Sequence, residues 1–102
     1  MCDIIVVNKK TNAFDVYIGR GSPLGNPFIM VDYSSAERER VIEEYRVWFL
    51  NMVAVKSPRI MSELSRIDEL LKNQDVRLGC FCAPKHCHGD VIKEYLNGVR
   101  KA

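Results

Sequence analysis

Short apolar runs near both ends of the chain predict β-strands. The run DIIVVN at Asp3–Asn8 is largely apolar and β-branched, as is typical of a buried strand. Phe14–Ile18 alternates apolar and polar positions, which predicts a second, half-buried strand. The polar residues Lys9–Asn12 between them predict a turn. Val76–Cys82 is a third apolar run and predicts a third strand.

Between and after these runs, apolar positions recur at helical spacing. Ser34 followed by Glu37 fits a capping box and begins a helix of about five turns. Ser57, with Pro58 at the first helical position, begins a second helix. A third helix is expected from about Cys87 to Arg100. The apolar positions are, helix by helix, Val41, Ile42, Tyr45, Trp48, Phe49 and Met52; Met61, Leu64, Ile67, Leu70 and Leu71; and Val91, Ile92, Tyr95, Leu96 and Val99.

The order of these elements predicts an α/β fold with a parallel core. Sheets of this kind bind ligands beyond the carboxyl ends of their strands. The glycine-rich loop Gly19–Phe28 follows the second predicted strand, and the cysteine- and histidine-rich turn Cys80–His88 includes the end of the third. We therefore expect the two segments to form one shared site.

Composition and charge limit the classes of protein to consider. With 102 residues, 47% apolar and 27% charged, the chain is expected to form a single α/β domain over residues 1–102. The net charge is only +2, so we expect no extended nucleic-acid surface. We expect no membrane span and no signal peptide. These features predict a cytoplasmic protein, in which clustered cysteines indicate metal binding or catalysis more often than disulfides.

The glycine-rich loop favours an anion site. Glycines free backbone amides to close around a phosphate, and an arginine between two of them would contact the same anion twice. The pattern is neither a Walker A loop nor a dinucleotide fingerprint. The alternative is a structural turn in which Leu24 and Phe28 fill the core. The expected ligand-binding residues are Gly19, Arg20, Gly21, Ser22, Gly25 and Asn26, with the asparagine directed to a sugar or base.

Three interpretations compete for the Cys/His turn, where three cysteines and both histidines fall within nine residues. Cys80, Cys82, Cys87 and His88 supply four zinc ligands on paper, although paired zinc cysteines usually have two to four residues between them. No cofactor is predicted, and zinc is the alternative. Cys80 and Cys82 equally fit small apolar side chains on a tight strand face.

The remaining interpretation is a reactive site. A helix N-terminus at Cys87 would lower the pKa of its thiol. His88 would act as a general acid or base, with Asp90 orienting it. Alternatively, Asp90 favours the helix start by its charge. Since we expect the turn to expose Cys87 and His88, the candidate catalytic residues are Cys87, His88 and Asp90.

Two long motifs carry a family resemblance. IGRGSPLGNPF at Ile18–Phe28 and LGCFCAPKHCHGDVIKEYL at Leu78–Leu96, with the Tyr45–Trp48 helix between them, resemble the bacterial and phage family called domain of unknown function 4326. The second motif more loosely resembles family 488, in which an arginine stands where this chain has Gly89. The resemblance implies a small Rossmann-like, three-layer fold and one site built by both motifs. The motif positions are Gly19, Arg20, Gly21, Pro23, Gly25, Asn26, Pro27, Cys80, Cys82, Cys87, His88 and Gly89.

These features lead to one preferred functional hypothesis and two alternatives. We expect the protein to bind, and if it is an enzyme to process, a nucleotide or another phosphorylated nucleoside derivative. The first alternative is a phage-type protein that sequesters a nucleotide or binds a host protein without turnover. The second is an interaction module stabilised by zinc. The sequence leaves the oligomeric state open.

Overall fold

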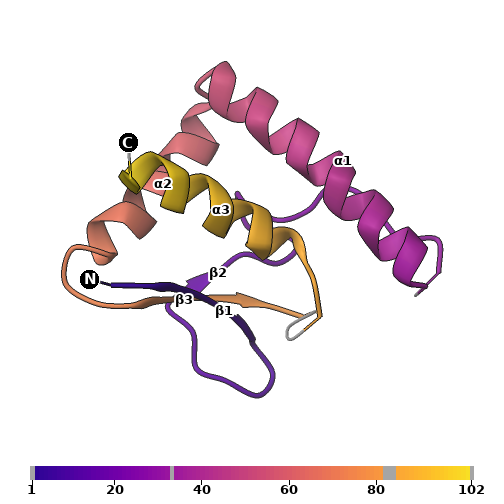
Figure 1. The fold of residues 1–102 in the computed structure, drawn as a ribbon, viewed down its shortest axis with the longest axis horizontal. Coiled ribbons are helices and arrows are strands. Elements are labelled where there is room, and N and C mark those ends of the chain that lie inside the picture. Colours follow the sequence, from indigo (N-terminus) through magenta and orange to yellow (C-terminus); the bar gives the residue numbers. More distant parts are fainter. Residues whose placement is uncertain (1, 33, 82–84, 102) are drawn as a thin grey trace.

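The computed structural model describes residues 2–32, 34–81 and 85–101. Three strands and three helices follow one another in the order β, β, α, α, β, α (Figure 1). The parallel α/β class predicted from the sequence is therefore confirmed. The elements are β1 Ile4–Asn8, β2 Val16–Tyr17, α1 Ser35–Ala54, α2 Pro58–Leu70, β3 Val76–Cys80 and α3 His88–Lys101.

The sheet has the order β1-β3-β2, and both pairs of neighbours are parallel. Ile4 pairs with Val76, and Val16 pairs with Leu78. β3 is thus central and β1 lies at an edge. Predicted as a buried strand, β1 fully buries only Ile4, whereas Ile5, which pairs with the exposed Arg77, is 40% exposed.

The three helices lie on one face of the sheet (Figure 1), so the fold has two layers instead of the three expected from the resemblance. The covered face buries Ile4, Val16 and Leu78. No helix among the described residues covers the other face, where Arg77 is exposed. The reason is the connection between β1 and β2. It consists of residues 9–15, without a helix, and it returns beneath the sheet (Figure 1).

The loop 9–15 is held close to the central strand. The backbone amide of Lys9 donates to the Cys80 carbonyl at 2.8 Å, and that of Asp15 donates to the Arg77 carbonyl at 2.9 Å. Phe14 lies over Gly79, where a Cβ would come within 2.7 Å of the Phe14 ring. Glycine at this position in β3 therefore lets the loop approach the sheet.

Ser34 begins α1, but only half of the predicted capping box forms. Its Oγ accepts from the Glu37 amide at 3.2 Å. The Glu37 carboxylate instead accepts from the Val31 amide at 3.1 Å and contacts Arg40. The inward-facing positions of α1 are buried as predicted at Val41, Ile42, Tyr45 and Phe49, whereas Trp48 and Met52 are half-buried.

The other two helices differ from prediction at single positions. Ser57 stands at the N-cap of α2, but its side chain forms no capping hydrogen bond. Ile60 joins the core although the predicted pattern began at Met61. Val99 near the end of α3 was predicted on the apolar side of the helix but is 53% exposed. Within the described residues, no helix is both long and apolar enough to span a membrane.

Candidate functional site

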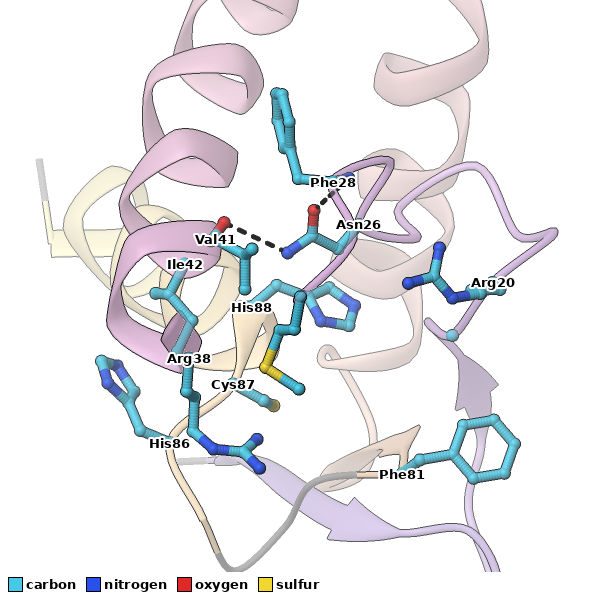
Figure 2. A pocket seen from close by; sticks show the side chains of 12 residues that line it. Arg20, Asn26, Phe28, Arg38, Val41, Ile42, Phe81, His86, Cys87 and His88 are labelled. Carbon is cyan, nitrogen blue, oxygen red and sulfur yellow. Dashed lines mark hydrogen bonds between the residues drawn. The ribbon is translucent and has the colours of Figure 1, made fainter. Parts of the chain in front are cut away.

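A cavity of about 140 Å³ opens beyond the carboxyl ends of β2 and β3 (Figure 2). The glycine-rich loop, the first turns of α1, the residue after β3 and the start of α3 all contribute to its wall. The expected convergence of the loop and the Cys/His turn is therefore observed. The lining residues are Gly19, Arg20, Asn26, Phe28, Met30, Arg38, Val41, Ile42, Phe81, His86, Cys87 and His88.

Two arginines from different elements line this cavity. Figure 2 shows Arg20 on the glycine-rich loop and Arg38 on α1 at different sides of the opening. Neither forms an ion pair with any residue that the structure describes. His86 lies near Arg38 in this view, and its Nδ1 is 3.0 Å from the Glu39 carboxylate. The cavity therefore offers guanidinium donors to an anion.

The remaining wall is largely apolar. Phe28, Met30, Val41 and Ile42 form much of it, and Phe81, the residue after β3, also lines the cavity. An apolar wall with a few convergent charged groups is the usual composition of a small-molecule site.

The glycine-rich loop uses several of its own donors internally. The Ser22 amide and Oγ both donate to the Gly19 carbonyl, at 3.1 and 2.6 Å, and the Gly25 amide donates to the Ser22 carbonyl at 3.0 Å. At Gly25 a Cβ would collide with the Gly19 carbonyl oxygen, so only glycine fits. Gly21 has φ +88°, a conformation that favours glycine.

The six predicted ligand-binding residues divide between two cavities. Gly19 and Asn26 line the site cavity together with Arg20. Gly21, Ser22 and Gly25 instead line a neighbouring cavity of about 390 Å³ that Arg20 and Asn26 also border.

Asn26 and Tyr45 position the loop. The Asn26 side chain donates to the Val41 carbonyl at 3.3 Å and accepts from the Phe28 amide at 2.8 Å (Figure 2). The buried Tyr45 hydroxyl donates to the Leu24 carbonyl at 2.8 Å. These bonds join the loop to α1. The contact of Asn26 with a sugar or base remains a prediction.

His88 is buried, contrary to the expected exposure, with 7% of its surface accessible. Its Nε2 lies 2.5 Å from the Ile18 carbonyl oxygen, so Nε2 carries the proton and donates. Its ring packs edge-on against Tyr45 at 5.0 Å between centroids. Burial lowers the pKa of His88, and the charge of Arg20 adds to this effect. The imidazole is therefore neutral at pH 7, with Nδ1 as an acceptor.

Cys87 is also buried, with 2% of its surface accessible, instead of exposed. Its Sγ is 3.3 Å from the Cys80 Sγ and accepts from the Gly89 amide at 3.3 Å. The neighbouring Cys80 thiol, and then burial, raise the pKa of Cys87, although the helix amide favours the thiolate. The prediction of a lowered thiol pKa was wrong because it considered the helix N-terminus without the surrounding core.

Asp90 contacts the backbone at the start of α3. Its Oδ2 accepts from the Cys87 amide at 3.0 Å and lies 3.6 Å from the His86 Nε2. The polar contact that fixes the His88 ring is the Ile18 carbonyl instead. Of the two roles considered for Asp90, the geometry supports the start of the helix.

The profile of the family described as Domain of unknown function (DUF4326) matches residues 6–98, which include both sequence motifs. The chain belongs to the DUF4326 family. A relative from Enterobacteria phage T4, described as an uncharacterized 12.4 kDa protein in the nrdA-td intergenic region, is 38% identical over 96 residues. The match covers 94% of this chain and 80% of the relative. No solved structure gave a significant match.

The metal alternative in this DUF4326 member rested on Cys80, Cys82, Cys87 and His88. Cys82 lies outside the described residues. Among the residues described, no group of three His, Cys, Asp or Glu side chains is placed to hold a metal ion. The zinc alternative remains a prediction that metal analysis of the purified protein tests.

Seven residues that line the cavity were absent from the predicted site: Phe28, Met30, Arg38, Val41, Ile42, Phe81 and His86. Arg38 precedes Val41 by three residues and Ile42 by four, so it lies in phase with the apolar positions of α1. A charged residue at such a position was the signal that sequence reasoning overlooked.

Proposed function

We propose that this DUF4326 protein binds a nucleotide or another phosphorylated nucleoside derivative in the site cavity. The observation that carries the proposal is the presence of Arg20 and Arg38, from separate elements, around one cavity. A guanidinium group presents paired donors that match phosphate oxygens. Since neither arginine forms an ion pair with a described residue, an anionic ligand would supply the missing charge.

The apolar part of the cavity wall is the reason to expect a nucleoside in the ligand. Phe28, Met30 and the α1 residues Val41 and Ile42 offer contact surface for a base or sugar. An inorganic anion alone would leave this apolar wall in contact with water.

The buried side chains of Cys87 and His88 favour binding of the ligand without its chemical conversion. Cys87 has a raised pKa and is a poor nucleophile at neutral pH. The Nε2 proton of His88 is committed to the Ile18 carbonyl. The geometry thus supplies ligand contacts and does not supply an activated nucleophile among Cys87, His88 and Asp90.

Calorimetric titration tests this proposal with 5′-mononucleotides and the matching unphosphorylated nucleosides. We expect the wild-type protein to bind the phosphorylated forms more tightly. Arg38→Ala and Arg20→Ala should each raise Kd by about tenfold or more, as for removal of a charge-assisted hydrogen bond. Arg66→Ala is the matched control because it removes the same charge from α2, where Arg66 pairs with Glu63.

Two further measurements complete the experiment. Thermal unfolding of each variant confirms that the fold is intact, and mass analysis of the recovered ligand shows whether it is unchanged. Equal affinity for nucleosides and nucleotides, or wild-type affinity in both Arg20→Ala and Arg38→Ala, would contradict the proposal.

A further inference from the structure

Aromatic rings and lysines gather on the sheet face that the helices leave open. The Tyr17 ring contacts Phe14 and Phe81, each at 6.4 Å between centroids. The Lys9 Nζ lies 4.8 Å from the Tyr17 centroid and 4.9 Å from that of Phe81, and the Lys10 Nζ lies 5.7 Å from Phe81. We call these five residues the ring-and-lysine surface.

The fold explains only part of this surface. Phe14 covers Gly79 and so contributes to packing. Phe81 is 48% exposed at the end of β3, and Figure 2 shows its ring directed outward. Neither lysine forms an ion pair with a residue that the structure describes. Partly exposed rings beside lysines that have no carboxylate partner among the described residues are a combination that suits single-stranded nucleic acid, because bases stack on rings and phosphates contact cations.

The ring-and-lysine surface is continuous with the site cavity, since Phe81 belongs to both. The cavity volume is about 140 Å³. Pockets that enclose a whole small ligand begin at roughly 300 Å³. A bound nucleotide would therefore extend outside the cavity, and beside Phe81 it would meet Tyr17 and the two lysines.

We propose that the ligand of the cavity is the phosphorylated end of a single-stranded nucleic acid. The terminal phosphate contacts Arg20 and Arg38, and the following nucleotides lie on the ring-and-lysine surface. This inference rests on the proposed function and specifies its ligand. A net charge of +2 predicted no extended nucleic-acid surface. The structure nevertheless places the Nζ atoms of both Lys9 and Lys10 beside the Phe81 ring.

Fluorescence anisotropy with short oligothymidylates tests the proposal. One strand carries a phosphate at its 5′ end and another at its 3′ end, each labelled at the opposite end, with hydroxyl-ended strands and a duplex for comparison. The wild-type protein should bind a phosphate-ended strand at least about tenfold more tightly than a mononucleotide. It should also bind that strand more tightly than the hydroxyl-ended strand and the duplex.

The double variant Lys9→Ala/Lys10→Ala separates the surface from the cavity. Backbone atoms make the hydrogen bonds of both residues to Cys80 and Asn8, so the loop is expected to keep its conformation. Strand affinity should fall about tenfold and mononucleotide affinity should stay constant. The slope of log K against log salt should decrease in magnitude by about 1.4, because each interaction of a lysine with a phosphate of a single strand contributes about 0.7.

Two single variants complete the comparison. Phe81→Leu keeps an apolar side chain but removes the ring, and should weaken strand binding about tenfold. Lys93→Ala removes one positive charge from α3, on the other side of the sheet, and should leave strand binding unchanged. Thermal unfolding verifies that every variant is folded.

The outcomes distinguish failure of this inference from failure of the proposed function. If mononucleotides bind with phosphate dependence but strands bind no more tightly, the inference is overturned and the proposed function stands. Wild-type strand affinity and salt slope in Lys9→Ala/Lys10→Ala would overturn it as well. If neither mononucleotides nor strand ends show any dependence on the terminal phosphate, both proposals fail.

Discussion

At the scale of single residues, burial determines the chemistry of the Cys/His turn. Cys80 and Cys87 form a thiol pair inside the core, and the His88 imidazole donates to a backbone carbonyl. A helix N-terminus stabilises a thiolate by a modest amount, whereas removal of the thiolate from water costs more. The net effect is a protonated thiol and a neutral imidazole.

The thiol pair should be unreactive in the folded protein. In a Cys2→Ser/Cys82→Ser background, we expect Cys80 and Cys87 to react with a chromogenic disulfide at least about tenfold more slowly than in denaturant, because burial and the raised pKa of Cys87 lower the thiolate fraction. The reaction rate at neutral pH is the measurement. Equal rates in the folded and denatured chain would show an activated thiol.

His88 should make stability depend on pH. Burial lowers the pKa of His88 in the folded state below the value of about 6.5 that it has when unfolded. Protonation therefore favours the unfolded chain, so stability is complete above about pH 6.5 and falls below it, by at most about 1.4 kcal/mol per pH unit.

Urea unfolding at about pH 7.5 and about pH 5.5 measures this effect. The control is His88→Gln, which keeps a donor for the Ile18 carbonyl but does not titrate in this range. The variant should lose less stability than the wild type on acidification. An identical loss in both proteins would assign the pH dependence to other groups.

At the scale of elements, loops and helix ends are joined by few, specific hydrogen bonds. Tyr45 and Asn26 connect the glycine-rich loop to α1, and Asp90 accepts from the amide that precedes α3. These bonds bring Arg20 and His88 to the same cavity. The order of the elements alone shows only that the glycine-rich loop and the Cys/His turn each follow the carboxyl end of a strand.

Asp90→Ala should affect the helix more than the site. Loss of the carboxylate at the start of α3 is expected to cost about 1 kcal/mol of unfolding free energy, as for other N-terminal capping groups. Nucleotide affinity should change less than twofold, roughly, since Asp90 does not line the cavity. Denaturant unfolding and calorimetry measure the two quantities. Unchanged stability with strongly reduced affinity would instead place Asp90 in the site.

At the scale of the whole molecule, the three helices enclose one face of the sheet and leave the other open (Figure 1). Phe49, which packs against Tyr45 and Tyr95 of the helices, is fully buried. Phe14, on the open face, is 40% exposed. The open face therefore contributes less burial to stability and retains rings and lysines available to a ligand.

The two-layer arrangement predicts unequal effects at two phenylalanines. Phe49→Ala should cost about 3–5 kcal/mol because it leaves a cavity among the helices, beside Tyr45 and Tyr95. Phe14→Ala should cost less, about half as much, since part of that ring is already in water. Chemical denaturation of the matched pair gives both values. Equal losses would mean that the open face is covered in solution, for example by a second copy of the chain.

The strands, the helices, their parallel order and the meeting of the two motifs at one edge of the sheet could be predicted from the sequence. These features follow from local periodicity and from glycine, proline and capping residues, which act over a few neighbouring positions. The burial of Cys87 and His88, the place of Arg38 in the cavity wall and the open face beside loop 9–15 became apparent from the three-dimensional structure. Burial, pKa and the side of a sheet depend on contacts between residues far apart in the chain, such as His88 with Ile18 and Phe14 with Gly79.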